Sequence, residues 1–330
     1  MQKSTLKKLS QTLGLSISTV SRALKDHPDI SENTRKKVKD LAAAMEYEPN
    51  SYAVQLRTRK SNVIGVLIPT INNFFYDTFI GAVEEEARRH GYSLLIMQSG
   101  DIVENETACL QYFRQHMIMG LFVALSVETD DLSPFKKMEE LEIPVVFVDR
   151  VPEEKGYYTV CLADEAAARM AAEAIIEKKK KNVLALFGHP HLSISRIRKE
   201  TFINIFKAKA PKTKIKIEAT ENPLPSKEAA ISALTSSKPP DVIFCMGDLI
   251  LIGVMKAIHQ LNLKVPQDVA VIGISNGFIP TMYNPEITYV ETSGNKLGKL
   301  AFVQMLARLR SENVPENVIV ESVIIKGGSL

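Results

Sequence analysis

The chain has 330 residues, more than one ordinary compact core accommodates, so two or three structural units are expected. Hydrophobic residues make up 45% of the sequence and charged residues 24%, a balance that excludes a fibrous or disordered protein. The sequence contains neither an apolar run of membrane length nor a secretory signal at its start, so we expect a cytoplasmic protein without a membrane partner.

The formal net charge of +3 is unevenly distributed. Residues 1–60 contain 12 Lys or Arg against 6 Asp or Glu, a net of +6, so the rest of the chain has a net charge of −3. Such a local excess is typical of a segment that binds nucleic acid, although a solvated basic face would have the same composition.

Helix start and stop signals predict three short helices in the N-terminal part of the chain. Thr5 is suited to cap a helix over residues 6–13, and Gly14 to end it in the left-handed conformation. Ser16 and Ser31 are suited to cap the next two helices. Two helices joined by a short turn and followed by a third predict a helix-turn-helix head, whose second helix enters the major groove of DNA.

Four segments of this part follow one another in a characteristic order: Thr5–Leu9, Gly14–Leu24, Ile30–Arg35 and Tyr47–Asn50. In these segments the chain resembles the lactose-repressor (LacI/GalR) family. The resemblance implies a small all-α helix-turn-helix DNA-binding domain over residues 1–48. It further implies a hinge helix and linker over residues 49–61 that enter the minor groove.

By this resemblance, Ile17, Ser18 and Arg22 occupy positions that read base edges. Arg22 would form a bidentate pair with guanine, with a phosphate contact as the alternative, and Ile17 would contact a thymine methyl group. Leu56 would be the apolar wedge at the operator centre, with an ordinary buried residue as the alternative. The DNA-binding residues implied in this way are Thr5, Ser16, Ile17, Ser18, Thr19, Ser21, Arg22, Asn50, Ala53, Leu56 and Arg57.

From Asn62 onward, apolar runs alternate with amphipathic segments. The runs predict buried parallel strands at residues 63–68, 93–97, 120–125, 145–148, 183–187, 242–246 and 269–274. The segments between them predict helices that include residues 79–90, 164–178, 195–207, 227–236 and 249–261. This alternation predicts an α/β body with open parallel sheets and a ligand site at the carboxyl ends of the strands.

The body, residues 62–330, is similar to the effector-binding and dimerisation domain of the same family. Val148–Arg150, Ser193–Arg198 and Gly247–Gly253 carry the resemblance. It implies a two-lobed, periplasmic-binding-protein-like domain with a small-molecule effector, a carbohydrate by default, in the cleft. The residues implied for the effector site are Asn73, Phe74, Phe75, Asp149, Arg198, Asp248, Asn276 and Phe278.

Structural alternatives accompany these assignments. Arg198 and Asp248 could pair with each other, and the phenylalanines could belong to the cores of the lobes. The sequence also departs from the usual family pattern, and the departures leave the effector class open. They are Thr201 for Gly, Gly247 for Asn, Asn276 for Asp and Thr292 for Gln.

Catalytic and cofactor motifs are not evident in the sequence. Residues 273–277 fit the G-x-S-x-G nucleophile pattern, but the last histidine, His259, precedes the serine and Pro280 interrupts the helix that should follow. We therefore expect no enzyme activity and no cofactor. We also expect no metal, because His189 and His191 lack an evident third ligand. Buried free thiols are expected at Cys109, Cys161 and Cys245.

The leading hypothesis is therefore a sequence-specific transcription regulator, expected to be a repressor, that binds a pseudo-palindromic operator as a homodimer. Residues 318–330 predict a strand and a Gly-Gly tail without a leucine heptad, so a dimer is expected rather than a tetramer. The rival hypotheses are a small-molecule binding protein that has lost its DNA function and an enzyme built on the α/β body.

Overall fold

A computed structural model describes residues 5–47 and 61–330 of the chain. The chain divides into two compact units, Met1–Ser61 and Asn62–Leu330, which we call the head and the body.

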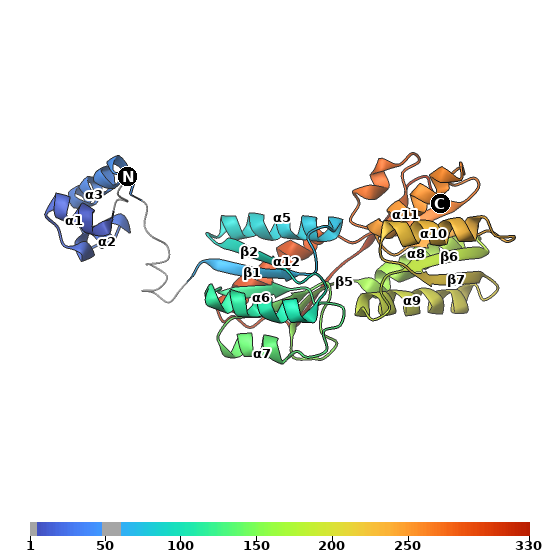
Figure 1. Cartoon of the computed structure of the whole chain (residues 1–330), viewed down its shortest axis with the longest axis horizontal. Coiled ribbons are helices and arrows are strands. Elements are labelled where there is room, and N and C mark those ends of the chain that lie inside the picture. The colour runs from blue at the N-terminus through green and yellow to red at the C-terminus, as the bar shows by residue number, and fades with distance from the viewer. Residues whose placement is uncertain (1–4, 48–60) are drawn as a thin grey trace. The chain divides into compact units, whose positions relative to one another are not determined.

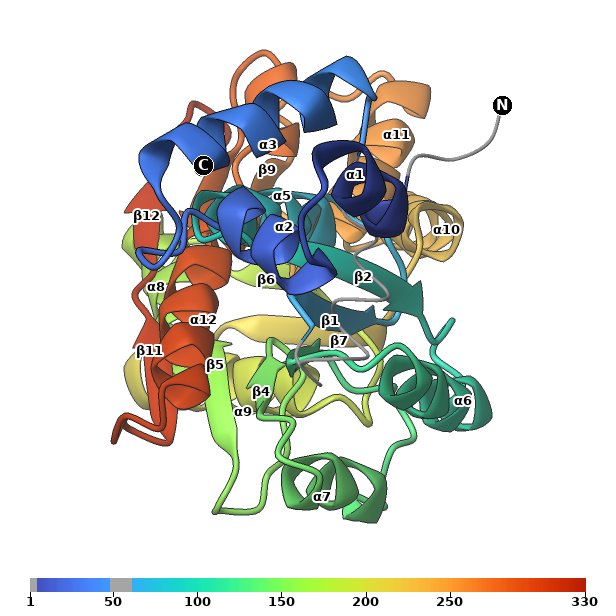
Figure 2. The same cartoon turned by 90° about the vertical axis from the view of Figure 1, so that its left-hand side faces the viewer.

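The described part of the head contains helices α1 (Leu6–Leu13), α2 (Ile17–Leu24) and α3 (Glu32–Ala44) (Figure 2). Their starts confirm the sequence prediction, because Thr5, Ser16 and Ser31 each accept a hydrogen bond from the backbone N–H three residues later. Gly14 ends α1 with φ of 63°, a left-handed conformation in which a side chain would be strained.

Apolar side chains from all three helices form the core of the head. Its buried members are Leu9, Val20, Ala23, Val38 and Ala42. The buried residues of α2 are Val20 and Ala23, so Ile17 and Ser18 at the start of this helix contribute nothing to the core. The start of α2 is therefore available to a partner.

The body has two lobes, each built on a six-stranded sheet. The strands of the N-lobe sheet are all parallel. In spatial order they are β11 (Asn317–Val320), β5 (Tyr158–Leu162), β4 (Val145–Val148), β3 (Gly120–Val123), β1 (Val63–Ile68) and β2 (Ser93–Gln98).

The C-lobe sheet is parallel except at one edge, where β12 (Val323–Ile325) pairs antiparallel with its neighbour. The other strands, in spatial order, are β10 (Thr288–Glu291), β9 (Ala270–Ser275), β8 (Val242–Cys245), β6 (Asn182–Phe187) and β7 (Lys214–Ala219). Sheets of this kind need helices on both faces, because both faces are apolar.

Helices cover both faces of the N-lobe sheet (Figure 1). One layer is α5 (Phe74–Arg89) with α12 (Gly294–Leu309), and the other is α6 (Val103–Gln115) with α7 (Ser133–Glu140). In the C-lobe the covering elements are α8 (Asp164–Glu177), α9 (Ser193–Lys209), α10 (Pro223–Leu234), α11 (Asp248–Gln260) and the 3-10 turn η1 (Ile279–Met282).

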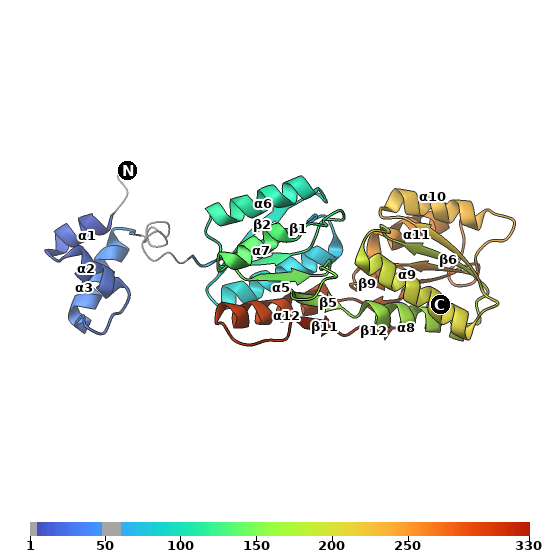
Figure 3. The same ribbon diagram turned by 90° about the horizontal axis from the view of Figure 1, so that it is seen from below.

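The chain passes from one lobe to the other after β5, after β10 and after β11 (Figure 3). Each lobe is consequently assembled from separate stretches of sequence. The helix α12, for example, follows a C-lobe strand but packs on α5 of the N-lobe.

Two glycines allow α12 to approach α5 closely. A Cβ atom on Gly294 would lie 2.5 Å from the carbonyl oxygen of Phe75, and one on Gly298 would lie 2.8 Å from that of Phe79. Real Cβ atoms do not tolerate such distances to backbone, so larger residues would push the helices apart. This contact fixes the N-terminal end of α5, which borders the cavity described below.

The observed two-lobed α/β architecture confirms the predicted fold class, but the sequence prediction omitted several elements. Strands β5, β7 and β10 and helices α6, α7 and α12 were not predicted, and α5 begins at Phe74 rather than at residue 79. The strand predicted from residue 318 corresponds to β11, but the second strand, β12, which lies in the other sheet, was not predicted.

The cysteines are free; Cys109 and Cys245 are buried, and Cys161 is half-buried. Over residues 5–47 and 61–330, no helix is both long and apolar enough to cross a membrane.

Candidate functional site

In the head, α2 presents a row of side chains to solvent. Ile17 is 48% exposed, an unusual exposure for a large apolar side chain with no packing role. Ser18 is exposed beside it, and the Arg22 side chain is 57% exposed one helical turn further along. An apolar group and a guanidinium on one exposed face can together recognise a thymine methyl group and the acceptors of guanine.

The start of α2 is fixed by hydroxyl groups. Ser16 Oγ accepts a hydrogen bond from the Thr19 N–H at 3.0 Å and lies 2.7 Å from Ser18 Oγ. The Ser16 hydroxyl therefore caps α2. The residue is nevertheless exposed to solvent.

An acidic residue that sequence analysis did not single out lies beside Arg22. Asp29 Oδ2 is 3.8 Å from Arg22 Nη1 and 3.3 Å from His27 Nδ1, and both the arginine and the aspartate are well exposed. An ion pair of this kind is weak, so Arg22 can exchange it for a DNA contact.

The other predicted DNA-binding residues of the described head also lie at or near its surface. Thr5 is exposed as the cap of α1, while Thr19 and Ser21 are half-buried on α2. Asn50, Ala53, Leu56 and Arg57 lie outside the residues that the structure describes.

In the body, a cavity of about 440 Å³ lies at the carboxyl ends of strands from both sheets. Asn73 borders it after β1, Asp149 after β4, Asp248 after β8 and Asn276 after β9. The predicted residues that line the cavity are Asn73, Phe75, Asp149, Arg198, Asp248 and Asn276. Parallel strands thus bring residues from distant stretches of sequence to one site.

Phe74 and Phe278 lie outside the lining and face each other instead. Their ring centroids are 6.0 Å apart, and Phe74 packs against the apolar core of the C-lobe. The Asn276 side chain donates a hydrogen bond to the Phe74 carbonyl at 2.7 Å. Since Phe74 belongs to the N-lobe and Asn276 to the C-lobe, this group connects the lobes beside the cavity.

A second contact between the lobes involves charged groups. Arg196 on α9 of the C-lobe donates to the carboxylate of Glu153, which follows β4 of the N-lobe. The lobes are therefore joined by side chains in addition to the chain crossings.

Arg198 pairs with Asp164, and not with Asp248 as the alternative considered above would have it. Its Nε and Nη2 atoms each lie 2.7 Å from Asp164 Oδ1, and Nη1 donates to the Met246 carbonyl at 3.2 Å. Both side chains are less than 10% exposed, at 7% and 9%. This buried ion pair was not predicted, because Asp164 is 34 residues away from Arg198 in the sequence.

Arg150, the other arginine of the cavity wall, is paired as well. Its Nη1 atom lies 2.5 Å from Asp101 Oδ1, and the same carboxylate oxygen accepts a hydrogen bond from the Val127 N–H. Asp101 also lines the cavity, and its role was not predicted from the sequence.

Asp149 is held by a tyrosine from α5. The Tyr76 hydroxyl donates to Asp149 Oδ2 at 2.8 Å, and both residues are buried. Asp149 has φ of 59°, in the left-handed region that aspartate and asparagine adopt more readily than other side chains. Burial raises the pKa of its carboxyl group, an effect that Arg150 and the Tyr76 hydroxyl partly oppose.

Asp248 accepts hydrogen bonds from the Ser275 hydroxyl and from the Asn276 N–H. Burial raises the pKa of this carboxyl group too, and these two hydrogen bonds partly oppose the rise. Ser275 is the serine of the G-x-S-x-G pattern. Its hydroxyl donates to the Asp248 carboxylate and not to a histidine base.

The departures noted in the sequence fall partly inside the cavity. Gly247, Asn276 and Thr292 line it, whereas Thr201 lies on α9 outside the lining. His189 also lines the cavity, 3.9 Å from the Glu221 carboxylate. In the described part of the chain, no cluster of three or more His, Cys, Asp or Glu side chains could hold a metal ion.

Two family models match the chain. Residues 5–50 match the model of bacterial regulatory proteins of the lacI family, and residues 64–313 match that of the periplasmic binding protein domain.

Curated relatives cover nearly the whole chain. The ribose operon repressor of Bacillus subtilis is 28% identical over 316 residues, with 96% of this chain and 94% of its own covered. The transcriptional repressor PurR of Vibrio cholerae is 25% identical over 311 residues, covering 93% and 92%. The transcriptional regulator RegA of Clostridium saccharobutylicum is 25% identical, with 97% of each chain covered.

Solved structures share the fold. The lac repressor dimer bound to operator and the anti-inducer ONPF superposes with a TM-score of 0.89 at 20% identity, with 99% of each chain covered. A periplasmic binding protein/LacI transcriptional regulator from Alkaliphilus metalliredigens, complexed with D-xylulofuranose, gives 0.71 at 22% identity, covering 82% of this chain and 99% of its own.

Proposed function

The chain belongs to the lacI family of bacterial regulatory proteins, whose members are DNA-binding transcription regulators and not enzymes, and we propose that it represses transcription from a pseudo-palindromic operator. Its periplasmic-binding-protein-like body implies control by a small molecule. The finer assignments below, of DNA contacts, effector class and assembly, are parts of the same proposal.

The observation that carries the proposal is the exposed face of α2. Ile17, Ser18 and Arg22 lie on a helix whose start is fixed by the Ser16 cap, within the segment that matches the lacI model. We assign base contacts to these three residues, and phosphate contacts to the hydroxyl groups near the starts of α1 and α2. The hinge role of residues 49–61, including the Leu56 wedge, is proposed from the family resemblance alone.

We further propose that the effector is a carbohydrate bound in the cavity between the lobes. The volume of about 440 Å³ suits one small ligand. Asp149, Asp248 and Asn276 offer acceptors and donors for hydroxyl groups, and Phe75 offers an apolar surface. One relative is named a ribose operon repressor, and one structural neighbour is complexed with a ketopentose.

Effector control would act through the contacts that join the lobes. A ligand that touches Asn276 competes with its hydrogen bond to the Phe74 carbonyl, and so favours a different angle between the lobes. Ligand and operator would then affect each other's affinity by the same factor, typically equivalent to 1–3 kcal/mol.

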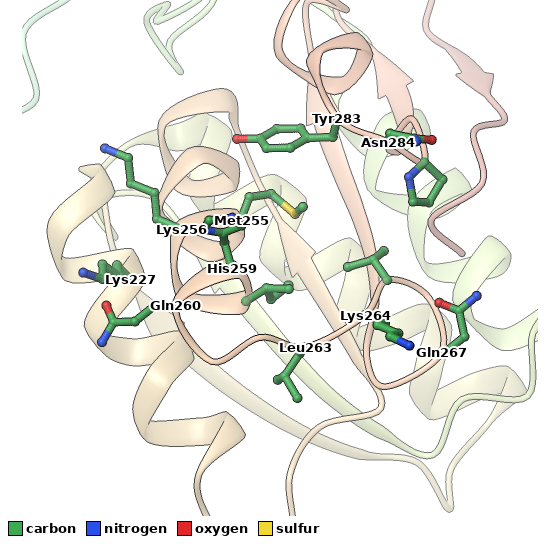
Figure 4. A pocket seen from close by; sticks show the side chains of 13 residues that line it. Lys227, Met255, Lys256, His259, Gln260, Leu263, Lys264, Gln267, Tyr283 and Asn284 are labelled. Atoms are coloured by element: carbon green, nitrogen blue, oxygen red, sulfur yellow. The ribbon is translucent and has the colours of Figure 1, made fainter.

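The same proposal includes a homodimer, for which the C-lobe offers an apolar face. Leu224 at the start of α10 and Met282 at the end of η1 are 64% and 61% exposed. Between these elements lies a groove of about 740 Å³, lined in part by Met255 and Tyr283 (Figure 4). We propose that a second copy of the chain covers this face, because it would remove Leu224, Met282 and the apolar side chains of the groove from water together.

The assembly is tested by sedimentation velocity on the double variant Leu224→Asp, Met282→Asp. We expect the wild type to be a dimer and the variant a monomer. The matched control is Val303→Asp, since Val303 is 63% exposed on α12, outside the proposed face. A monomeric control beside a dimeric double variant would move the interface to the N-lobe.

The function is tested by fluorescence polarisation of the purified protein against duplexes enriched from a random pool, with and without sugars. A regulator should select a palindrome, bind it with a steep salt dependence, and release it or bind it more tightly in the presence of one ligand. Equal affinity for all duplexes would reject the regulator and leave the rival small-molecule binding protein. Turnover of a ligand would instead support an enzyme.

A further inference from the structure

The charges that line the body's cavity are unequally matched. Its basic side chains, among the described residues that form the lining, are Arg150, Arg198 and His189. Its acidic side chains are Asp101, Asp149, Glu221 and Asp248. Which of these groups is already neutralised decides the charge of the ligand that fits.

Both arginines are neutralised by the protein. Arg198 directs two of its nitrogens at Asp164 Oδ1 and a third at the Met246 carbonyl, in a position that is almost completely buried. Arg150 lies 2.5 Å from Asp101. An arginine in such a pair can still donate a hydrogen bond, but its charge no longer offers an anion a net attraction.

The remaining carboxylates are not in direct ion pairs with these arginines, although the charge of Arg150 acts on Asp149. Asp149 accepts a hydrogen bond from the neutral Tyr76 hydroxyl, and Asp248 accepts one from the neutral Ser275 hydroxyl and one from a backbone N–H. Glu221 has the His189 ring 3.9 Å away. Burial raises the pKa of both aspartates; the charge of Arg150 partly opposes the rise at Asp149, whereas only hydrogen bonds oppose it at Asp248.

Helix N-termini could in principle offset this excess, since several helices begin at the cavity. The first turn of α11 contains Asp248 itself, and the first turn of α8 contains Asp164. The first turn of α10 contains Pro223 and Pro225, which have no N–H to donate. At the start of α9 the apolar residues Leu192 and Ile194 form the lining. At the start of α5 the Asn73 side chain already accepts the Phe75 N–H, and the first turn contains Asp77.

We propose that the cavity selects an effector without a phosphate or carboxylate group, namely an uncharged polyol or its amine-bearing counterpart. This inference rests on the proposed function, because it names the chemical class of ligand for the same cavity. A phosphate there would face carboxylates with spare lone pairs and arginines already paired, whereas hydroxyl and ammonium groups would donate hydrogen bonds to those carboxylates.

The first test is calorimetric titration of the full chain with matched ligands: D-ribose against D-ribose 5-phosphate, and D-glucose against D-glucosamine and D-glucose 6-phosphate. We expect each phosphate ester to bind at least about a hundredfold more weakly than its parent sugar, and the amine to bind no more weakly than the parent. A phosphate ester that binds as tightly as its parent sugar overturns the inference.

The second test does not depend on the identity of the sugar. Inorganic phosphate is titrated into the wild type and into the double variant Asp101→Asn, Asp248→Asn, which removes the ion-pair partner of Arg150 and a second carboxylate. We expect the variant to bind phosphate at least about tenfold more tightly than the wild type, and the further change Arg150→Gln to abolish the gain.

The two tests separate the two hypotheses. Tight phosphate binding by the wild type that Arg150→Gln removes overturns the charge argument, whatever sugar binds. Failure of every sugar, with the phosphate results as expected, counts against the carbohydrate proposal and supports the exclusion of anions.

Discussion

The exposed face of α2 in the head and the charged cavity in the body differ in how far their charged side chains are paired within the protein. On α2 of the head these side chains are exposed to solvent: Arg22 has one weak ion-pair partner, and Ile17 lies outside the core of the head. The cavity instead pairs its arginines within the protein, Arg198 with Asp164 and Arg150 with Asp101. A surface that meets a long polyanion can present weakly paired cations, whereas a buried arginine needs a counter-charge before any ligand arrives.

This difference predicts which substitutions damage folding and which damage binding alone. The largest effect is expected from Arg198→Ala, because it leaves Asp164 buried without a counter-charge. Loss of one partner of a buried pair costs about 3–5 kcal/mol of the free energy of unfolding. Urea denaturation followed by circular dichroism would measure the loss.

Two further variants sharpen that measurement. Replacing both partners, as Arg198→Met with Asp164→Leu, removes the unpaired charge and should recover most of the stability. Arg196→Ala, which removes the more exposed ion pair between Arg196 and Glu153, should change the free energy of unfolding by less than about 0.5 kcal/mol. A single Arg198→Ala variant as stable as the wild type would show that the pair has no structural role.

Arg22→Ala should behave in the opposite manner. We expect operator affinity to fall by an amount equivalent to about 1–3 kcal/mol, roughly tenfold to a hundredfold, with no change in stability. Fluorescence anisotropy on the selected duplex and on one with the contacted guanine replaced would check this. If the variant lost equal affinity for both duplexes, Arg22 would be a phosphate contact and not a base reader.

The third expected effect, a smaller one, concerns pH. Because burial raises the pKa of Asp149 in the folded body, the folded state binds that proton more tightly than the unfolded state does. The associated stability is therefore fully present below the ordinary pKa of 3.8 and is lost as the pH rises through the raised value.

Asp149→Asn should remove this dependence. Asparagine tolerates the left-handed backbone and can still accept the hydrogen bond from Tyr76. We expect the melting temperature of the variant, relative to the wild type, to increase as the pH rises from about 4 to about 7. Asp77→Asn, an exposed substitution on α5, should show no such trend. A constant difference across that range would mean that Asp149 titrates normally.

The smallest effect is expected from Asp29→Asn. It removes the exposed partner of Arg22, so the arginine no longer has to give up an ion pair when it binds DNA. We expect about twofold tighter operator binding at low salt and no difference at high salt, because exposed pairs contribute little and are screened. Weaker binding by this variant would instead mean that Asp29 orients Arg22 for its contact.

The same contrast explains what could be predicted from the sequence. The head was predictable because its signals are local: a cap and the N–H that it binds are three residues apart, as in Ser16 and Thr19. The first strands of each lobe were predictable because they are continuous apolar runs. Strand β7 was not, because Lys214, Lys216 and Glu218 interrupt its apolar residues at the edge of the sheet.

In the cavity, sequence patterns located individual residues but not their partners. Asp149 and Tyr76 are 73 residues apart, and Arg150 and Asp101 are 49 apart. Which carboxylate meets which arginine depends on the order of the strands in the sheet, and one sequence alone does not specify that order. For this reason the role of Asp164 was missed, although Arg198 was singled out.

The chain crossings between the lobes also determine the order in which the protein can be completed during its synthesis. The N-lobe begins first, with β1, yet its helix α12 and strand β11 are made only after strands β6 to β10 of the C-lobe. Until α12 leaves the ribosome, the apolar surface that it covers on α5 and the sheet has no permanent cover. The lobe that starts earliest thus closes only near the end of synthesis, shortly before β12 completes the edge of the C-lobe sheet, and its uncovered surface is open to aggregation until then.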